Sequence, residues 1–130
     1  MDEWKNKSVL ITGASRGIGR ALAEHFIELE ADVILTATTK NSIPESLIGR
    51  KWIIGDFSIS VERDRIIEEI RGHGELYSCI NNAGINTIKS IEDISPIEYD
   101  RLMDIDLKAP YFICQVVSPL MKNGGRIVNI

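Results

Sequence analysis

Hydrophobic and polar positions follow two different periods along this chain. Short apolar runs rich in β-branched residues are typical of buried strands, and between them an apolar residue recurs every three or four positions, as in helices. The pattern predicts five strands, at 8–12, 32–38, 51–57, 76–80 and 126–130. Strands separated by helices indicate a parallel sheet with right-handed crossovers, so we expect a doubly wound α/β fold of Rossmann type.

Two of the helical segments have one clearly apolar face. The first follows the first strand and is predicted to pack through four residues: Ile18, Leu22, Phe26 and Leu29. The second, over 61–71, is predicted to turn three isoleucines toward the core: Ile66, Ile67 and Ile70. Its many charged residues are then a solvated face.

A longer helix is predicted near 96–122. Ser95 and Glu98 have the spacing of a capping box, with Pro96 at the first helical position. Pro110 should kink or interrupt this helix, because proline has no N–H and clashes with the preceding turn. The second half has an apolar stripe: Ile113, Val116, Val117 and Leu120.

The composition indicates one domain over residues 1–130 and restricts its partners. Hydrophobic residues make up 44% of the chain and charged residues 26%, which is ordinary for a globular protein. The net charge of −4 argues against nucleic acid or an anionic membrane as the main partner. We find neither an apolar run of about 18 residues nor a secretory signal, so we expect a cytoplasmic protein.

The two cysteines, Cys79 and Cys114, lie in apolar stretches without the spacing of metal ligands. We therefore expect buried free thiols rather than a disulfide or a reactive site, and we expect no metal.

A glycine-rich segment, "TGASRGIG" at 12–19, joins the first strand to the first helix. Glycines allow a sharp turn and a close approach of the backbone to a ligand, and a helix N-terminus suits a pyrophosphate. The spacing is Gly-x-x-x-Gly-x-Gly. Such a segment, taken alone, is also compatible with a tight strand–helix turn that binds nothing.

The end of the second strand bears on the choice of nicotinamide cofactor. Proteins that prefer NAD usually place a carboxylate there for the ribose 2′-hydroxyl, but this segment reads "TATTK" at 36–40. Its hydroxyls, with Lys40 and with Arg16 of the glycine-rich segment, could meet a 2′-phosphate instead. We therefore predict NADP(H) over NAD(H); the alternative is that both cations are merely exposed.

Together these motifs resemble the short-chain dehydrogenase/reductase family. "TGASRGIG" is similar to its cofactor fingerprint, "NNAG" at 81–84 to its second signature, and "GDF" at 55–57 to a third position, in the expected order. The likeness runs from Lys7 to Ile130 and covers about the first half of a typical member. Within the family, the "GASRGIG" string is most similar to that of β-ketoacyl carrier-protein reductases.

The resemblance implies a cofactor-binding role for residues in all three motifs. Those expected to line the pyrophosphate and ribose are Gly13, Ser15, Arg16, Gly17, Ile18 and Gly19. Those expected further along the cofactor are Thr38 near the 2′-phosphate, Asp56 and Phe57 at the adenine, Asn82 at the adenosine ribose, and Ala83 and Gly84 beside the cofactor. For "NNAG", a turn held by asparagine side chains is the alternative.

The family's proton-transfer residues have no complete counterpart here. A Tyr protonates the developing alkoxide, a Lys four residues later assists it, and a Ser orients the carbonyl. No Tyr-x-x-x-Lys occurs in the sequence, and the Ser would fall just beyond Ile130. Asp106 stands where the family has a catalytic Asn; it either weakens the proton relay or keeps a role that rests on backbone geometry.

We therefore expect the cofactor-binding half of an NADP(H)-dependent reductase or dehydrogenase for a small carbonyl or alcohol substrate. The alternative is a non-catalytic NADP(H)-binding module or a pseudoenzyme that depends on a partner. The 130 residues alone are expected not to turn over a carbonyl, because they lack the catalytic Ser, Tyr and Lys. A fifth strand in a parallel sheet expects further strands beside it, which indicates a longer parent protein. The resemblance also implies a homo-oligomer that buries the apolar stripe of the helix near 96–122 between subunits.

Overall fold

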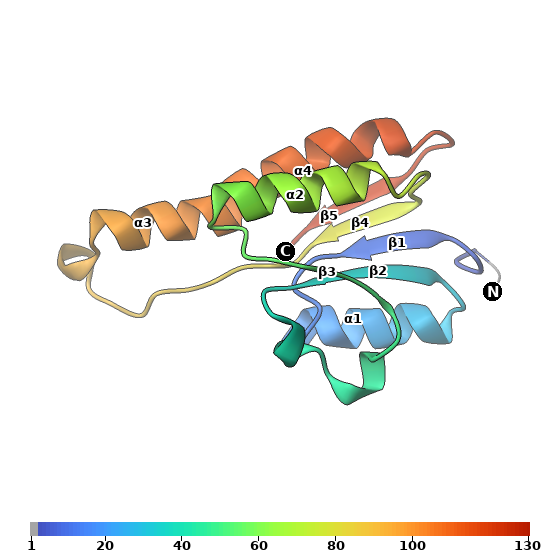
Figure 1. Ribbon diagram of the computed structural model, residues 1–130, viewed down its shortest axis with the longest axis horizontal. Helices are drawn as coiled ribbons and strands as arrows, with labels where there is room; N and C mark the ends of the chain where they lie inside the picture. The colour runs from blue at the N-terminus through green and yellow to red at the C-terminus, as the bar shows by residue number, and fades with distance from the viewer. Residues whose placement is uncertain (1–2) are drawn as a thin grey trace.

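The computed structural model describes residues 3–130, so the first two residues of the predicted domain lie outside it. Five strands form one parallel sheet in the order β3-β2-β1-β4-β5 (Figure 1). Their bounds are Ser8–Ile11 for β1, Asp32–Ala37 for β2, Lys51–Ile54 for β3, Ser78–Asn81 for β4 and Arg126–Asn129 for β5. The predicted parallel α/β fold with five strands is confirmed.

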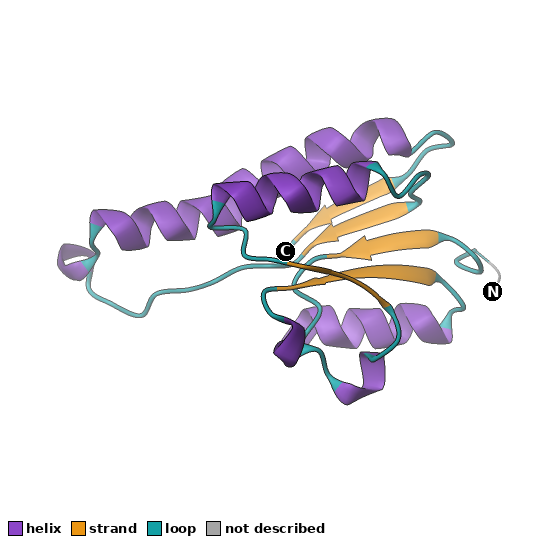
Figure 2. Ribbon diagram, in the orientation of Figure 1, coloured by secondary structure: helices purple, strands orange, loops and turns teal. Residues whose placement is uncertain are grey.

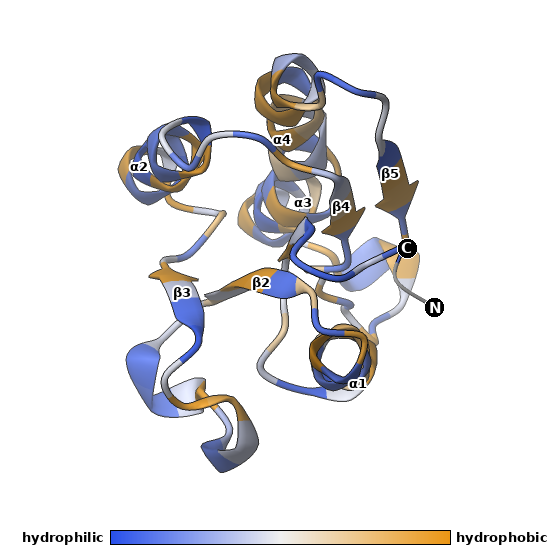
Figure 3. Cartoon of the chain, turned by 90° about the vertical axis from the view of Figure 1, so that its right-hand side faces the viewer, coloured by the Kyte–Doolittle hydropathy of each residue, from blue (hydrophilic) through white to orange (hydrophobic). Residues whose placement is uncertain are grey.

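Helices cover both faces of this sheet (Figure 2). Their bounds are Gly17–Glu28 for α1, Ser60–Arg71 for α2, Pro96–Met103 for α3 and Ala109–Val117 for α4. α1 lies on one face, α2 and α4 lie together on the other, and α3 extends beyond the sheet (Figures 1 and 3). The chain winds outward from β1 to β3 and then returns to place β4 on the other side of β1. The loops after β1 and β4 therefore leave in opposite directions, which opens a crevice at their carboxyl ends.

The core has one layer on each face of the sheet, because successive residues of a strand point to opposite sides. Leu10 packs with Ile66 and Ile70 of α2, as predicted, whereas Val9 and Ile11 pack on the side of α1. Figure 3 shows the apolar sides of the helices turned toward the strands.

One prediction for α1 is wrong. Ile18 is 59% exposed, and the residues that α1 buries are Gly19, Ala23 and Phe26. The first turn of α1 lies past the carboxyl ends of the strands, so Ile18 has no sheet surface beneath it and lines the crevice instead.

The third strand is shorter than predicted. It ends at Ile54, after which the N–H of Gly55 still donates to the carbonyl of Ala37 and the chain then turns, with the N–H of Ile59 donating to the carbonyl of Asp56. The "GDF" motif is therefore a loop at the carboxyl edge of the sheet rather than the end of a strand.

The long helix is interrupted where Pro110 predicts it. α3 begins with the predicted capping box of Ser95 and Glu98, and a π-helical turn, Asp104–Lys108, separates it from α4. Proline has no N–H to donate, and the wider π-helical turn accommodates the missing backbone hydrogen bond.

The apolar stripe of α4 does not lie where the resemblance placed it. Ile113, Val116 and Val117 are almost fully buried within the chain, in the core layer that α4 shares with α2 and β4, and Leu120 packs against the same layer. These residues are therefore not available as a surface between subunits. Over residues 3–130, none of the helices has the length and apolarity needed to cross a membrane.

Candidate functional site

The glycine-rich segment packs directly against the loop that follows β4. Gly13 has a φ of +64°, and a Cβ on it would lie 2.7 Å from the Cα of Ala83. A Cβ on Gly19 would lie 2.2 Å from the carbonyl oxygen of Gly13 and 2.5 Å from Nδ2 of Asn82. Both positions therefore require glycine, and their contacts bring the two predicted motifs together at one edge of the sheet.

Hydrogen bonds lock the same two loops. Oγ1 of Thr12, which is 1% exposed, accepts from the backbone N–H of Asn82 at 3.0 Å and of Ala83 at 2.9 Å. In return Nδ2 of Asn82 donates to the carbonyls of Thr12 and Gly13, each at 3.1 Å. The side-chain amide nitrogen of Asn82 thus holds the two loops together, and these loops form the floor of the crevice.

A groove opens over this floor at the carboxyl ends of the strands. Of the residues predicted to bind a cofactor, those that line it are Gly13, Ser15, Arg16, Gly17, Ile18, Thr38, Asp56, Phe57, Asn82, Ala83 and Gly84. The groove is also lined by Thr36 and Ala37 of the "TATTK" segment, by Gly55 of "GDF", and by Ile85, Arg101 and Ile105, which lie in none of the motifs. Gly19 is buried and lies beneath the groove, where it allows the loops to meet.

The N-terminus of α1 opens onto the groove. Arg16 is the N-cap and makes no side-chain capping bond, so the N–H groups of the first turn have no side-chain acceptor there. Unpaired N–H groups and the positive end of the helix dipole make this a favourable place for an anion. The exposed guanidinium of Arg16 adds a full positive charge at the same end of the groove.

The end of β2 supplies hydroxyls to the groove and no carboxylate. Oγ1 of the buried Thr36 accepts from the N–H of Gly13 at 3.1 Å, and Thr38 is exposed at the rim. Lys40, which the sequence suggested as a second cation here, lies in a short 3₁₀ turn and does not line the groove. Of the two cations suggested for a 2′-phosphate, Arg16 is therefore the one that lines the groove.

The carboxylate of Asp56 is fixed by its own loop. Its Oδ1 accepts from the backbone N–H of Ser58 at 2.8 Å and from the hydroxyl of Ser58 at 2.7 Å. Oδ2 has no hydrogen-bond donor among residues 3–130, which leaves it free to accept one from a ligand in the groove. Phe57, beside it, is 6% exposed and belongs to the core as well as to the groove wall.

Asp106 lies in a second hollow that continues the groove. The two share Ala83, Gly84 and Ile85, and the second also includes Asp106 and Tyr111. Oδ1 of Asp106 accepts from the backbone N–H of Ile85 at 2.9 Å. The predicted site is thus one elongated surface with Asp106 at the end away from Asp56.

Both cysteines are free thiols. Cys79 is fully buried, and burial raises the pKa of its thiol to about 12, so it is unreactive at neutral pH. Cys114 is half-buried and lines the second hollow, which makes it less enclosed than predicted. Within the described range, His, Cys, Asp and Glu nowhere form a group of three that could hold a metal.

The sequence profile described as short chain dehydrogenase matches residues 7–130 of this chain. The chain belongs to the short-chain dehydrogenase family. Among its relatives is the cyclic-di-GMP-binding biofilm dispersal mediator protein of Escherichia coli K12, 32% identical over 130 residues, which are all of this chain and 55% of that protein.

Solved structures similar to this chain agree with the fold. A blue fluorescent protein from a metagenomic library, solved with NADPH, is 29% identical, with a TM-score of 0.84 over 96% of this chain and 55% of its own. A metagenomic short-chain oxidoreductase solved with NADP is 29% identical, with a TM-score of 0.83 over 97% of this chain and 61% of its own. The chain spans about half the length of the curated relatives it matches.

Proposed function

We propose that this chain is the NADP(H)-binding part of a short-chain dehydrogenase that transfers hydride between the cofactor and a small carbonyl or alcohol substrate. The observation that carries the proposal is the groove itself. It joins the free N-terminus of α1, the close-packed Gly13 and the cation of Arg16 at the crevice between β1 and β4. This is the position at which open α/β sheets bind dinucleotides.

We propose one direction for the dinucleotide in the groove. The pyrophosphate lies at the N–H groups of the segment from Ser15 to Gly19, where backbone donors face an anion. The adenine lies toward Asp56, whose free Oδ2 accepts from the exocyclic amino group. The nicotinamide then extends past Ala83 and Gly84 into the second hollow, toward Asp106.

NADP(H) rather than NAD(H) is proposed because the end of β2 offers hydroxyls and no carboxylate, and because Arg16 of the glycine-rich segment lines the same groove. A guanidinium forms charge-assisted hydrogen bonds with a phosphate, and a carboxylate at this place would repel it. Two of the solved relatives, at 29% identity, hold NADPH or NADP, which supports the assignment.

The test compares Arg16→Ala with the wild type of the full gene product. We expect Arg16→Ala to weaken NADPH about 10- to 100-fold and NADH less than about 3-fold, because only NADPH presents the 2′-phosphate. Arg71→Ala is the matched control, because Arg71 is an exposed arginine on α2 that pairs with Glu68 and does not line the groove. Equal losses for both cofactors would refute the assignment.

A non-catalytic NADP(H)-binding module is the second candidate. Asp106 favours it, because a carboxylate replaces the amide that the resemblance expects. The Escherichia coli relative is named for nucleotide binding and biofilm dispersal. Assaying NADPH oxidation by the full gene product against a panel of aldehydes and ketones separates the two. Turnover above the rate of a Gly19→Ala control supports the dehydrogenase, and tight NADPH binding without turnover supports the module.

We also propose that two copies associate through the outer side of the long helix. Leu107 and Tyr111 are 58% and 64% exposed and lie between the second hollow and a further, mostly apolar hollow. The other residues that line this further hollow are Met103, Asp104, Lys108 and Phe112. This surface differs from the buried stripe that the sequence suggested. Light scattering on Leu107→Asp is the test: a monomer is expected where the wild type is an oligomer, and a monomeric wild type would refute association.

A further inference from the structure

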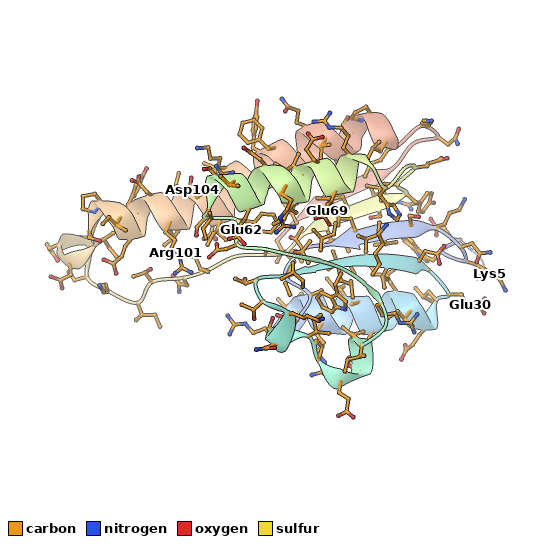
Figure 4. The ribbon with its side chains drawn as sticks, in the orientation of Figure 1. Lys5, Glu30, Glu62, Glu69, Arg101 and Asp104 are labelled. Carbon is orange, nitrogen blue, oxygen red and sulfur yellow. The ribbon has the colours of Figure 1, made fainter. Side chains whose placement is uncertain are left out.

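Arg101 belongs to the wall of the groove although it lies in no cofactor motif. It comes from α3, one helical turn before Ile105, so the two side chains share a face of the helix, and both line the groove. Figure 4 shows Arg101 on the side of α3 that faces the extended segment after β4. Arg101 thus continues the wall of the groove whose apolar part is formed by Ile105 and Ile85.

The guanidinium of Arg101 has no hydrogen-bond or ion-pair partner among residues 3–130, although carboxylates surround it on the helix. Glu98 pairs with Lys89 at 2.5 Å. Asp104 lies 3.7 Å from the ammonium of Lys108 and 4.0 Å from the guanidinium of Arg63. The two carboxylates one helical turn from Arg101 are therefore engaged by other cations, and the guanidinium of Arg101 is left free to meet a ligand.

A buried arginine links the loop that holds Asp56 to the helix that holds Arg101. Arg63 of α2 is 6% exposed, donates to the carbonyl of Phe57 at 2.8 Å and reaches Asp104 at the end of α3. This one side chain ties the loop that holds Asp56 to the helix that holds Arg101. Arg63 therefore connects the two walls at this end of the groove.

We propose that Arg101 stacks its guanidinium on the adenine ring of the bound dinucleotide; the inference rests on the proposed function and adds a binding residue to it. Asp56 accepts a hydrogen bond from the edge of the adenine, so the two faces of the ring are left to contact the walls of the groove. A guanidinium is planar, delocalised and weakly hydrated, so it covers an aromatic face well. The phosphates of the dinucleotide bind elsewhere, at Arg16 and the N-terminus of α1.

Stacking predicts a distinctive pattern of affinities in the full gene product. Arg101→Ala should weaken NADPH and NADH by the same factor, about 3- to 30-fold, and should leave nicotinamide mononucleotide unchanged because that ligand has no adenine. Arg101→Lys should recover little of the loss, since an ammonium has no plane to stack. Arg71→Ala is the control for removing an exposed arginine from another helix.

The possible results separate this inference from the proposed function. If the wild type binds NADPH and Arg101→Ala binds it equally well, the stacking role is overturned and the proposed function stands. If the loss is confined to NADPH and disappears at 0.5 M salt, Arg101 is a phosphate ligand and stacking is likewise overturned. If the wild type binds neither cofactor, both proposals fall. Because Arg101 is exposed, thermal unfolding of the variants should match the wild type and confirm that they are folded.

Discussion

The carboxylate of Asp106 accepts a hydrogen bond from the backbone N–H of Ile85, 2.9 Å away and separated by 21 positions in the chain. The bond joins the π-helical turn to the loop after β4, the two elements between which the groove continues into the second hollow. An acceptor at position 106 is all that this contact needs. An asparagine could supply it equally well, so the acidic residue preserves the loop while adding a negative charge beside it.

Substitutions of Asp106 separate its role as a hydrogen-bond acceptor from the effect of its negative charge. Asp106→Asn keeps an acceptor for the N–H of Ile85, and we expect the free energy of unfolding to stay within about 0.5 kcal/mol of the wild type. Asp106→Leu removes the acceptor and should cost about 1 kcal/mol, with faster hydrogen exchange at the amide of Ile85. Slow exchange at Ile85 in the leucine variant would show that the bond does not hold the loop.

Thr12 should be among the most sensitive polar residues of the groove. Thr12→Val keeps the shape of the side chain but leaves the N–H groups of Asn82 and Ala83 without their acceptor, which should cost about 2 kcal/mol in urea unfolding. Thr12→Ser is the matched control, because it keeps the hydroxyl. If the valine and serine variants unfold at the same urea concentration, the two bonds do not stabilise the floor of the groove.

Gly19 tests the close contact of the two loops. The Cβ of Gly19→Ala would overlap the carbonyl of Gly13, so we expect a loss of about 3 kcal/mol and no measurable NADPH binding. Gly72→Ala is the control, because its φ is −76° and its new Cβ would lie 3.6 Å from the nearest carbonyl oxygen. We expect that variant to be within about 1 kcal/mol of the wild type. Normal NADPH affinity in Gly19→Ala would contradict the packing described here.

The capping box of α3 predicts a pH dependence. The hydrogen bond from Lys89, and those from the backbone and side chain of Ser95, lower the pKa of Glu98 from 4.5 to about 2. Because the folded state lowers this pKa, its contribution to stability is present above pH 4.5 and is lost as the pH falls toward 2. Urea unfolding from pH 7 to 2.5 should show a shallower acid loss in Glu98→Gln than in the wild type. The effect is screened by salt, since the pair is on the surface.

If the free energy of unfolding falls equally steeply with pH in the two proteins, folding does not lower the pKa of Glu98.

The five strands, the helices between them and the place of the glycine-rich segment between β1 and α1 follow from the sequence, because alternating periods and glycine spacing are local signals. Ile18 shows the first limit of such signals: the helical period marks it as apolar, but only the fold shows that α1 extends past the sheet at that residue. The third strand shows another, since its end at Ile54 is set by the hydrogen bonds of the loop after it. Arg101 has no motif, and its place in the groove follows from the direction in which α3 leaves the sheet. Its spacing of four residues from Ile105 was a sequence signal, because it places both side chains on the same face of a helix.

The central claim is that the groove between β1 and β4 binds NADP(H), and a fluorescence titration of the full gene product with NADPH and then NADH tests it most directly. We predict a saturable signal at one site per chain, with NADPH bound at least about tenfold more tightly than NADH because of its 2′-phosphate. A flat titration with both cofactors, or equal affinity for the two, would contradict the account.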